Sequence, residues 1–296
     1  MNSDGEAESD SVVVEHNRVL AVPGNEKLAV EALSDWIERQ SIDEFVVAGA
    51  SEDERSRLLD SFRCWIPEVE QRSAPFVDLA ELRAKGESHL EAVSSNTRAQ
   101  LRRSKRAYEM LGELQVRVAQ TVEEALEFFQ ELIVLHEKRW EKRGFAGAFA
   151  SAARKSFHLD FIRSAFDEGR VHLLRVVCGS DTVGILYNFQ ANGYVSFYQS
   201  GFDYPADRRL KPGLLTHHMA IEHYRTNNFL EYDFLASEKG EFQYKRSLST
   251  GERPLFWVSF SRPGTKHRFL RCLRWFRETR RLVFGSPAVA QMTAEV

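Results

Sequence analysis

Apolar residues recur at two spacings along the 296-residue chain, and each spacing predicts its own kind of element. A return at every third or fourth position makes one helix face apolar, whereas alternation with polar residues favours a strand. Helices are expected over 27–40, 51–66, 95–111, 121–140, 151–169, from Pro212 onward and, as a short one, across 239–248. Strands are expected over 44–50, 74–80, 114–119, 170–178, 182–191, 194–203, 229–236 and 254–260.

The order of these elements divides the chain. Residues 1–12 are acidic and nearly free of apolar side chains, which is typical of a disordered tail. Residues 13–92 should form a small α/β unit, and 93–261 a longer one with the order β-α-α-β-β-β-α-β-α-β. The remainder, 262–296, is expected to be a basic amphipathic helix and a tail. The fold class predicted from this order is a mixed α/β protein.

Composition is that of a soluble globular protein, with 43% hydrophobic and 28% charged residues. No stretch reaches the roughly 20 apolar residues of a membrane-spanning helix, and the acidic N-terminus is unlike a secretory signal. We therefore expect a cytoplasmic protein. Its three cysteines, Cys64, Cys178 and Cys272, lie far apart in the sequence, which disfavours a disulfide framework or a zinc site.

The segment 197–224 joins a predicted strand to a predicted helix through a basic loop. Pro212 suits the first helical turn, because its missing N–H is not needed there. A helix N-terminus leaves backbone N–H groups unpaired and carries partial positive charge, so it attracts phosphate. Gly213 would let a ligand approach the backbone closely. We predict a diphosphate site formed by Arg208, Arg209, Lys211, Pro212, Gly213 and Leu214.

Four stretches, taken in order, carry a resemblance to a known superfamily: SSNTRAQLRRSKR, LHEKRW, GFDYPADRRLKPGLL and YDFLASEKGEFQYKRSL. Over about 94–260 the chain resembles the GNAT superfamily of N-acyltransferases, especially its CelD-like branch, with Fem-type aminoacyltransferases as more distant relatives. The resemblance implies a mixed, mostly antiparallel sheet whose fourth and fifth strands part into a V-shaped wedge for acyl-CoA. It also implies a preceding degenerate GNAT-like unit, over 13–92, and a link to exopolysaccharide or cell-envelope biosynthesis.

The loop departs from the superfamily's pattern, Q/R-x-x-G-x-G/A. With Arg208 at the first position, Lys211 replaces the first glycine and Gly213 keeps the second. The resemblance implies acetyl-CoA or another acyl-CoA as donor, and aminoacyl-tRNA, which Fem-type relatives use, is the alternative. The expected acceptor is a small amine or an amino sugar.

Acyl transfer from a thioester to an amine needs a base for the amine and a proton for the leaving thiolate. Asp233 on the predicted fifth strand and Glu238 just beyond it are the candidate bases. Tyr198 on the fourth strand and Tyr244 are the candidate proton donors. A Tyr-Lys pair at the place of Tyr244 and Lys245 recurs in the CelD-like branch. Each of these residues could equally be an ordinary core or surface residue.

No metal site is expected. His217, His218, Glu222 and His223 lie within two helical turns, but the H-E-x-x-H order of a zinc-binding helix is missing. The chain also lacks a Walker loop, a dinucleotide-binding glycine loop and a nucleophile elbow, which disfavours NTPases, Rossmann enzymes and α/β-hydrolases.

The basic, aromatic-rich segment 266–281 leaves a second class of function open. It would suit an anionic membrane surface or a polysaccharide synthase, and it could equally pack on the core. The alternative to an enzyme is therefore a non-catalytic scaffold with a GNAT fold. No specific nucleic acid is predicted as a partner.

Overall fold

The computed structural model describes residues 15–142, 144, 147–236 and 243–264, which form two compact units. The larger unit consists of Ala74–Leu235 together with Gln243–Arg253, and the smaller one of Ala236 and the described residues before Ala74 and after Arg253. The tail expected over 1–12 and the basic helix expected over 266–281 lie outside the described residues.

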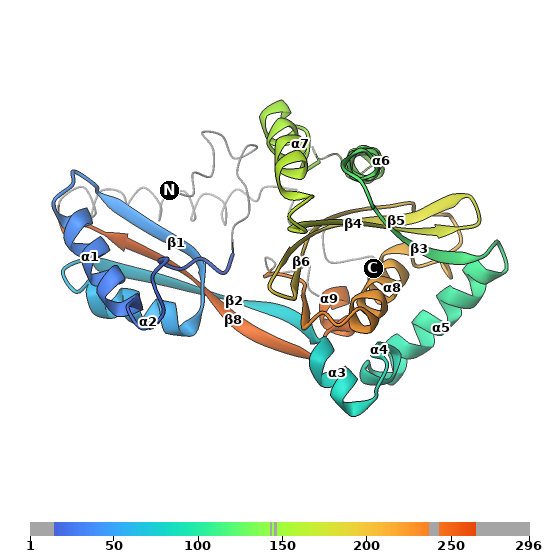
Figure 1. The fold of residues 1–296 in the computed structure, drawn as a ribbon, viewed down its shortest axis with the longest axis horizontal. Helices are drawn as coiled ribbons and strands as arrows, with labels where there is room; N and C mark the ends of the chain where they lie inside the picture. Colours follow the sequence, from blue (N-terminus) through green and yellow to red (C-terminus); the bar gives the residue numbers. More distant parts are fainter. Residues whose placement is uncertain (1–14, 143, 145–146, 237–242, 265–296) are drawn as a thin grey trace, which may run out of the picture. The chain divides into compact units, whose positions relative to one another are not determined.

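Eight strands of the described chain pair into one sheet in the order β1-β8-β2-β7-β6-β5-β4-β3 (Figure 1). Their bounds are β1 (Glu44–Ala50), β2 (Ile66–Asp78), β3 (Leu114–Val118), β4 (Val171–Cys178), β5 (Asp181–Ala191), β6 (Tyr194–Phe202), β7 (Glu231–Asp233) and β8 (Gly251–Ser261). The pairs β1–β8, β2–β7, β3–β4, β4–β5 and β5–β6 are antiparallel, whereas β6 and β7 are parallel. The mixed, mostly antiparallel α/β sheet is therefore confirmed.

Nine helices lie within the described residues: α1 (Glu26–Glu38), α2 (Glu52–Ser61), α3 (Leu79–Lys85), α4 (His89–Ala92), α5 (Ser95–Glu109), α6 (Val122–Glu141), α7 (Ala152–Ala165), α8 (Pro212–Thr226) and α9 (Gln243–Leu248). Several begin at a hydroxyl that accepts the backbone N–H three residues later, as at Ser51, Ser94 and Thr121. None of these described helices is long and apolar enough to cross a membrane.

In the larger unit, helices cover both faces of the sheet, with α6 and α7 on one side and α8 on the other (Figure 1). Leu173 and Ile185 belong to the core beneath α6 and α7. Their chain neighbours Leu174 and Leu186 belong to the core beneath α8 and α5. This alternation follows from the strand period of two, and it explains why β4 and β5 are apolar on both faces.

The smaller unit has an aromatic core of its own. The ring of Phe62, at the end of α2, stacks on Phe45 of β1 at 5.3 Å and on Phe260 of β8 at 4.7 Å. Val30 and Ile37 of α1 belong to this core.

The structure differs from the predicted elements mainly between 66 and 92. There β2 begins at Ile66 rather than at 74, and the short helices α3 and α4 occupy a stretch with no predicted helix. Both helices are capped locally by side chains, Asp78 for α3 and Ser88 for α4. They are too short to show a helical period, so the sequence signal was only their caps.

Candidate active site

Strands β6 and β7 run side by side for three residue pairs and then part, the last pair being Ser196 and Asp233. Beyond Asp233 the chain stays beside β2, where the N–H of Phe234 donates to the carbonyl oxygen of Pro75 at 2.9 Å. Meanwhile β6 continues beside β5. We call the place where the rest of β6 and the segment after Asp233 are no longer paired the wedge.

Lys245 of α9 lies at the wedge. Its Nζ donates to the carbonyl oxygen of Phe234 at 3.0 Å and lies 5.4 Å from the ring centroid of Phe197 on β6. The neighbouring Tyr244 packs its ring 5.7 Å from that of His217 on α8. Lys245 therefore contacts both walls of the wedge, and Tyr244 packs against α8.

Asp233 is the last residue of β7, and only 3% of it is exposed. Its Oδ1 accepts the N–H of Leu235 at 2.7 Å. Leu235 has a positive φ of 58°, which is uncommon for a residue with a large side chain. The carboxylate thus holds the turn that carries the chain away from β6, and its role as a base stays a prediction. Glu238 lies outside the described residues.

Helix α8 begins at Pro212, as predicted, and its first turn has N–H groups to offer. The N–H of Lys211 donates to Ser104 Oγ of α5 at 2.9 Å, and no side chain caps the helix. Among the hydrogen bonds of the described residues, none is made by the N–H of Gly213 or Leu214. A helix start of this kind favours a bound anion.

The three cations of the loop differ in how they are held. Arg209 makes an ion pair with Asp207, with 2.7 Å between Nη2 and Oδ2. The same two side chains are also hydrogen-bonded, and together the two interactions raise the pKa of Arg209 and lower the pKa of Asp207. Arg208 is exposed and Lys211 is half-buried, and neither forms an ion pair within the described part of the chain. Arg208 and Lys211 are therefore the loop cations best placed to meet a phosphate.

Gly213 is packed against an aromatic ring. A Cβ added at this position would lie 3.2 Å from Cε2 of Phe202 on β6. We expected a ligand to approach the backbone at Gly213, but the ring of Phe202 occupies the space next to its Cα. Replacing Gly213 would disturb how β6 packs on α8, which makes it a poor probe of ligand binding.

Strand β6 has a β-bulge at Tyr198. Its register with β5 passes from Asn188–Phe197 directly to Tyr187–Gln199, which leaves Tyr198 as the extra residue. Phe197 belongs to the core beneath α8, whereas Tyr198 packs on the core beneath α6 and α7. Tyr198 therefore lies on the α6 and α7 side of the sheet, just beyond the point where β7 leaves.

A histidine that the sequence did not single out stands behind Tyr198. Nε2 of His158, on α7, lies 3.0 Å from the Tyr198 hydroxyl, and Nδ1 lies 3.3 Å from the hydroxyl of Tyr187. Burial, helped by the charge of Arg154, lowers the pKa of His158 to about 4, and burial raises the pKa of Tyr198 to about 12. All three groups are therefore neutral at pH 7. The only sequence signal was a lone histidine on an apolar helix face, which usually marks a core residue.

The other histidine cluster, on α8, makes internal contacts. His217 is fully buried, with Nδ1 at 3.0 Å from the Tyr232 hydroxyl, and burial lowers its pKa to about 3. Nδ1 of His218 lies 2.9 Å from Nδ1 of His89, whose backbone N–H donates to Glu222 at 2.5 Å. Within the residues that the structure describes, no three potential metal ligands are grouped.

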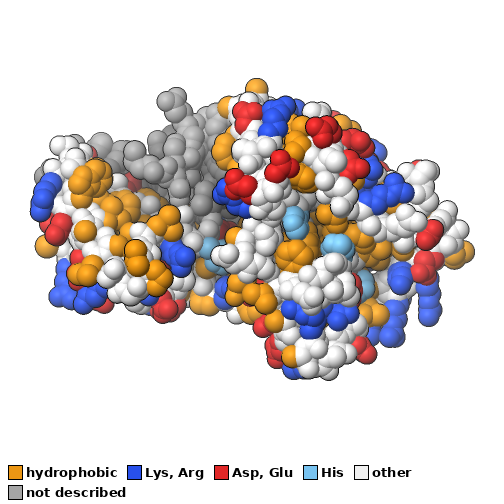
Figure 2. All heavy atoms as spheres, in the orientation of Figure 1, with side chains coloured by type: hydrophobic (Ala, Val, Ile, Leu, Met, Phe, Trp, Pro, Cys, Tyr) orange, Lys and Arg blue, Asp and Glu red, His pale blue; other side chains and the backbone are white. Residues whose placement is uncertain are grey.

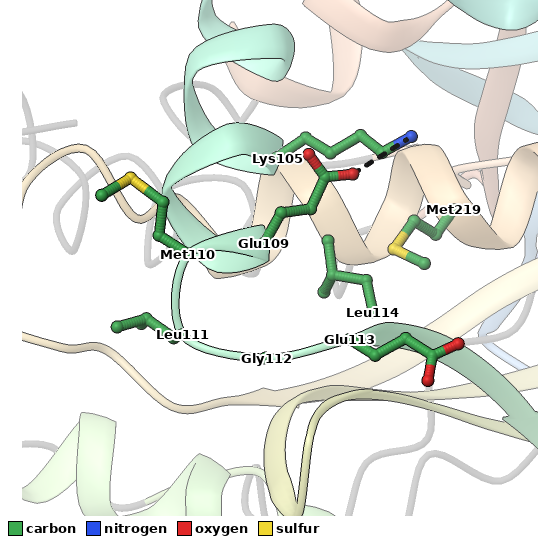
Figure 3. A pocket seen from close by; sticks show the side chains of 8 residues that line it. All are labelled: Lys105, Glu109, Met110, Leu111, Gly112, Glu113, Leu114 and Met219. Atoms are coloured by element: carbon green, nitrogen blue, oxygen red, sulfur yellow. Dashed lines mark ion pairs between the residues drawn. The ribbon is translucent and has the colours of Figure 1, made fainter.

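A separate open pocket of about 610 Å³ lies where the end of α5 meets the start of β3 and the middle of α8 (Figure 3). On one side Lys105 and Glu109 approach at 3.8 Å, and Met219 of α8 lies on the other. None of the predicted site residues lines it, so it is distinct from the wedge. Its lining consists of Lys105, Glu109, Met110, Leu111, Gly112, Glu113, Leu114 and Met219.

Helix α5 presents a basic surface close to the start of α8. Figure 2 shows Lys and Arg side chains gathered over this helix, where Arg102, Arg103, Lys105 and Arg106 are exposed. Ser104, within this run, is the buried residue that accepts the Lys211 N–H.

The sheet is mixed, its parallel pair of strands parts at the wedge, and the loop after β6 leads to a helix with an uncapped start. This is the arrangement expected for an N-acyltransferase fold. The chain belongs to the acetyltransferase (GNAT) domain family, whose model matches residues 95–246. The resemblance drawn from the sequence is therefore confirmed. A search of the curated proteins finds no match to the chain.

Solved structures with a similar fold share little sequence with it. The C-terminal domain of a putative lysylphosphatidylglycerol synthetase from Agrobacterium fabrum is 12% identical, with a TM-score of 0.57 over 88% of this chain and 79% of that one. FemX is 12% identical, with a TM-score of 0.56 over 81% and 79%. L-PGS from Bacillus licheniformis is 9% identical, with a TM-score of 0.55 over 85% and 78%. At these identities the likeness shows the fold alone.

Proposed function

We propose that this GNAT-domain protein is an N-acyltransferase that moves an acyl group, in the simplest case acetyl, from acyl-CoA to an amine. The observation that carries the proposal is the wedge next to an uncapped α8. The diphosphate of the donor would bind at the N–H groups of Gly213 and Leu214, between Arg208 and Lys211. The thioester arm would then lie beside β6 in the wedge.

The residues around the wedge can supply the chemistry that the reaction needs. The amine nitrogen attacks the thioester carbonyl, a C–N bond forms, the C–S bond breaks, and the thiolate takes a proton. Asp233 or Glu238 is the proposed base, and Tyr198 or Tyr244 the proposed proton donor. The ammonium of Lys245, beside Phe234, is close enough to the wedge to stabilise negative charge on the reacting group.

The proposed acceptor is a small amine or an amino sugar, used in exopolysaccharide or cell-envelope biosynthesis. Support for this step comes from the resemblance to the CelD-like branch. We also propose that the reaction takes place in the cytoplasm, as expected from the composition of the chain.

A second donor, aminoacyl-tRNA, is favoured by one observation. The exposed basic residues of α5 adjoin Ser104, which contacts the residue preceding α8. A basic surface beside the donor site would suit a nucleic-acid backbone, and such binding weakens steeply as salt rises.

Calorimetric titration of the full chain with acetyl-CoA and longer acyl-CoAs tests the donor assignment. We expect the double variant Arg208→Ala/Lys211→Ala to bind at least about tenfold more weakly, because each charge-assisted hydrogen bond contributes roughly 1.5–3 kcal/mol. The matched control is Arg163→Ala on α7, an exposed arginine paired with Asp160 at 3.0 Å, which should bind as the wild type does.

Two other outcomes would decide against this donor. Folded protein that binds no acyl-CoA but binds aminoacyl-tRNA in a salt-dependent way would favour the second donor. Acyl-CoA binding with no transfer to any amine, accompanied by binding to membranes or a synthase, would favour the scaffold.

A further inference from the structure

The hydrogen-bonded chain Tyr187–His158–Tyr198 carries an inference that rests on the proposed acyl transfer and deepens it. We propose that Tyr187 and His158 fix the direction of these hydrogen bonds, so that the Tyr198 O–H is left to donate a proton to the leaving thiolate. Tyr198 is then the catalytic acid, and His158 and Tyr187 are positioning residues.

The first step concerns the hydroxyl proton of Tyr187. This side chain is fully buried and packs against the rings of Phe129 and Phe189 at 5.3 and 5.1 Å. Among the described residues, the one hydrogen-bond partner of its hydroxyl is Nδ1 of His158. A buried hydroxyl proton without an acceptor costs about 1–3 kcal/mol. Tyr187 therefore donates to Nδ1.

The second step concerns the proton of His158. This residue has no exposed surface, and burial keeps its imidazole neutral at pH 7 by lowering its pKa to about 4. A neutral imidazole has one N–H and one bare nitrogen. Since Nδ1 accepts from Tyr187, the proton is on Nε2. It is donated to the Tyr198 oxygen at 3.0 Å, an ordinary N–H···O distance.

The third step concerns the Tyr198 hydroxyl. Its oxygen already accepts from His158, so its own O–H is directed elsewhere. The side chain is half-buried and lies at the β-bulge of β6, beyond Ser196, where the strand has lost its pairing with β7. This proton is therefore available to a substrate on the α6 and α7 side of the wedge.

Matching each donor with an acceptor in the same way disfavours the opposite direction of hydrogen bonding. If Tyr198 donated to Nε2, His158 would donate from Nδ1 to Tyr187. The Tyr187 proton would then have no acceptor among the described residues, and Tyr198 could only accept from a substrate.

The proton balance closes on this assignment. Tyr198 gives its proton to the sulfur as the C–S bond breaks, and the resulting phenolate is stabilised by the Nε2–H of His158. The amine nitrogen is positively charged after its attack, and one of its protons, taken first by the proposed base, restores the Tyr198 hydroxyl. The net change is one proton from amine to thiol, and His158 keeps its own proton throughout.

The direct test needs no substrate. Long-range ¹H–¹⁵N spectra of the full chain, labelled with ¹⁵N-histidine and assigned with His158→Gln, report which ring nitrogen carries the proton. We expect the Nε2–H tautomer in the wild type and in Tyr198→Phe. In Tyr187→Phe, which keeps the ring but removes the donor, the Nδ1–H tautomer should appear. Tyr194→Phe, an exposed tyrosine on the same strand, should change nothing. An Nδ1–H tautomer in the wild type would overturn the proposal.

A kinetic test follows once an acceptor is found. Tyr198→Phe should lower kcat about 100-fold and Tyr187→Phe about 10-fold, with the KM for acyl-CoA unchanged in both. His158→Gln, whose amide N–H can still donate to Tyr198, should retain more activity than His158→Leu. Equal activity in these two variants would refute the positioning role. Failure of the wild type to bind any acyl-CoA would refute the proposed donor and leave the tautomer result standing.

Discussion

A single missing side chain lets β6 lie against α6. A Cβ added at Gly201 would be 2.5 Å from the carbonyl oxygen of Leu132 and 2.9 Å from Cβ of Leu135. One residue earlier, the Ser200 carbonyl oxygen lies 3.1 Å from Nδ1 of His136. That ring accepts the Ala148 N–H at Nε2, so its proton is on Nδ1 and is donated to Ser200. These contacts hold β6 in place beside the wedge.

Gly201→Ala should therefore destabilise the protein. The new methyl group meets backbone atoms of α6, which cannot turn aside, so we expect a loss of about 1–3 kcal/mol in the free energy of unfolding. Urea denaturation measures it. Gly264→Ala is the control, because an added Cβ there has nothing within 4 Å and should change stability by less than about 0.5 kcal/mol. Two equally stable variants would contradict the close approach.

The individual site residues differ in how far the sequence could predict them. Tyr244 and Lys245 were proposed from the resemblance to the CelD-like branch. Lys245 lies at the wedge, and Tyr244 packs on His217 of α8. The role of His158 could not be predicted, because its contact with Tyr198 spans 40 positions of sequence and no local motif indicates it. The contact between Ser104 and Lys211 spans 107 positions and was equally invisible.

At the scale of elements, the prediction worked where the hydrophobic period was long. The three consecutive strands β4, β5 and β6 and the helix α6 have nearly the bounds that the period gave. Strand β7 is shorter than expected, because Leu235 adopts a positive φ of 58° and donates its N–H to the Asp233 side chain. This turn ends the pairing with β6 at Asp233, and the hydrophobic period carries no sign of it.

The start of α8 depends on α5, and Ser104→Ala tests that dependence. Removing the hydroxyl leaves the Lys211 N–H without its acceptor, so we expect about 1 kcal/mol less stability and weaker acyl-CoA binding. Ser56→Ala is the control: its hydroxyl also bonds a backbone group, but on α2 in the smaller unit. It should leave acyl-CoA binding unchanged. Calorimetry and urea unfolding separate the two effects, and unchanged stability in Ser104→Ala would refute the first.

At the scale of the whole molecule, the two compact units are not successive pieces of the chain. Strand β8 begins in the larger unit and continues beyond Arg253 in the smaller one, and β2 likewise passes from one to the other at Ala74. Hydrophobic periodicity is a local signal, so it could not reveal that a late strand completes an early unit. The division into 13–92 and 93–261 stays a prediction about the chain's organisation along its sequence.

Buried histidines make the folded state sensitive to acid. Burial lowers the pKa of His158 to about 4 and that of His217 and His218 to about 3, each from an ordinary value of 6.5. Below pH 6.5 the unfolded chain therefore binds more protons than the folded one. Stability is complete above that pH and is lost as pH falls toward 4 and below.

We expect the free energy of unfolding to decrease between pH 6.5 and 4, by about 3 kcal/mol from His158 alone. Urea unfolding at a series of pH values measures this slope. His158→Gln cannot take up the proton, so its stability, whatever its value at pH 7, should fall less steeply than that of the wild type. A wild-type stability that stays flat across this range, or a variant with the same slope, would mean that His158 is protonated as easily in the folded state as in the unfolded chain.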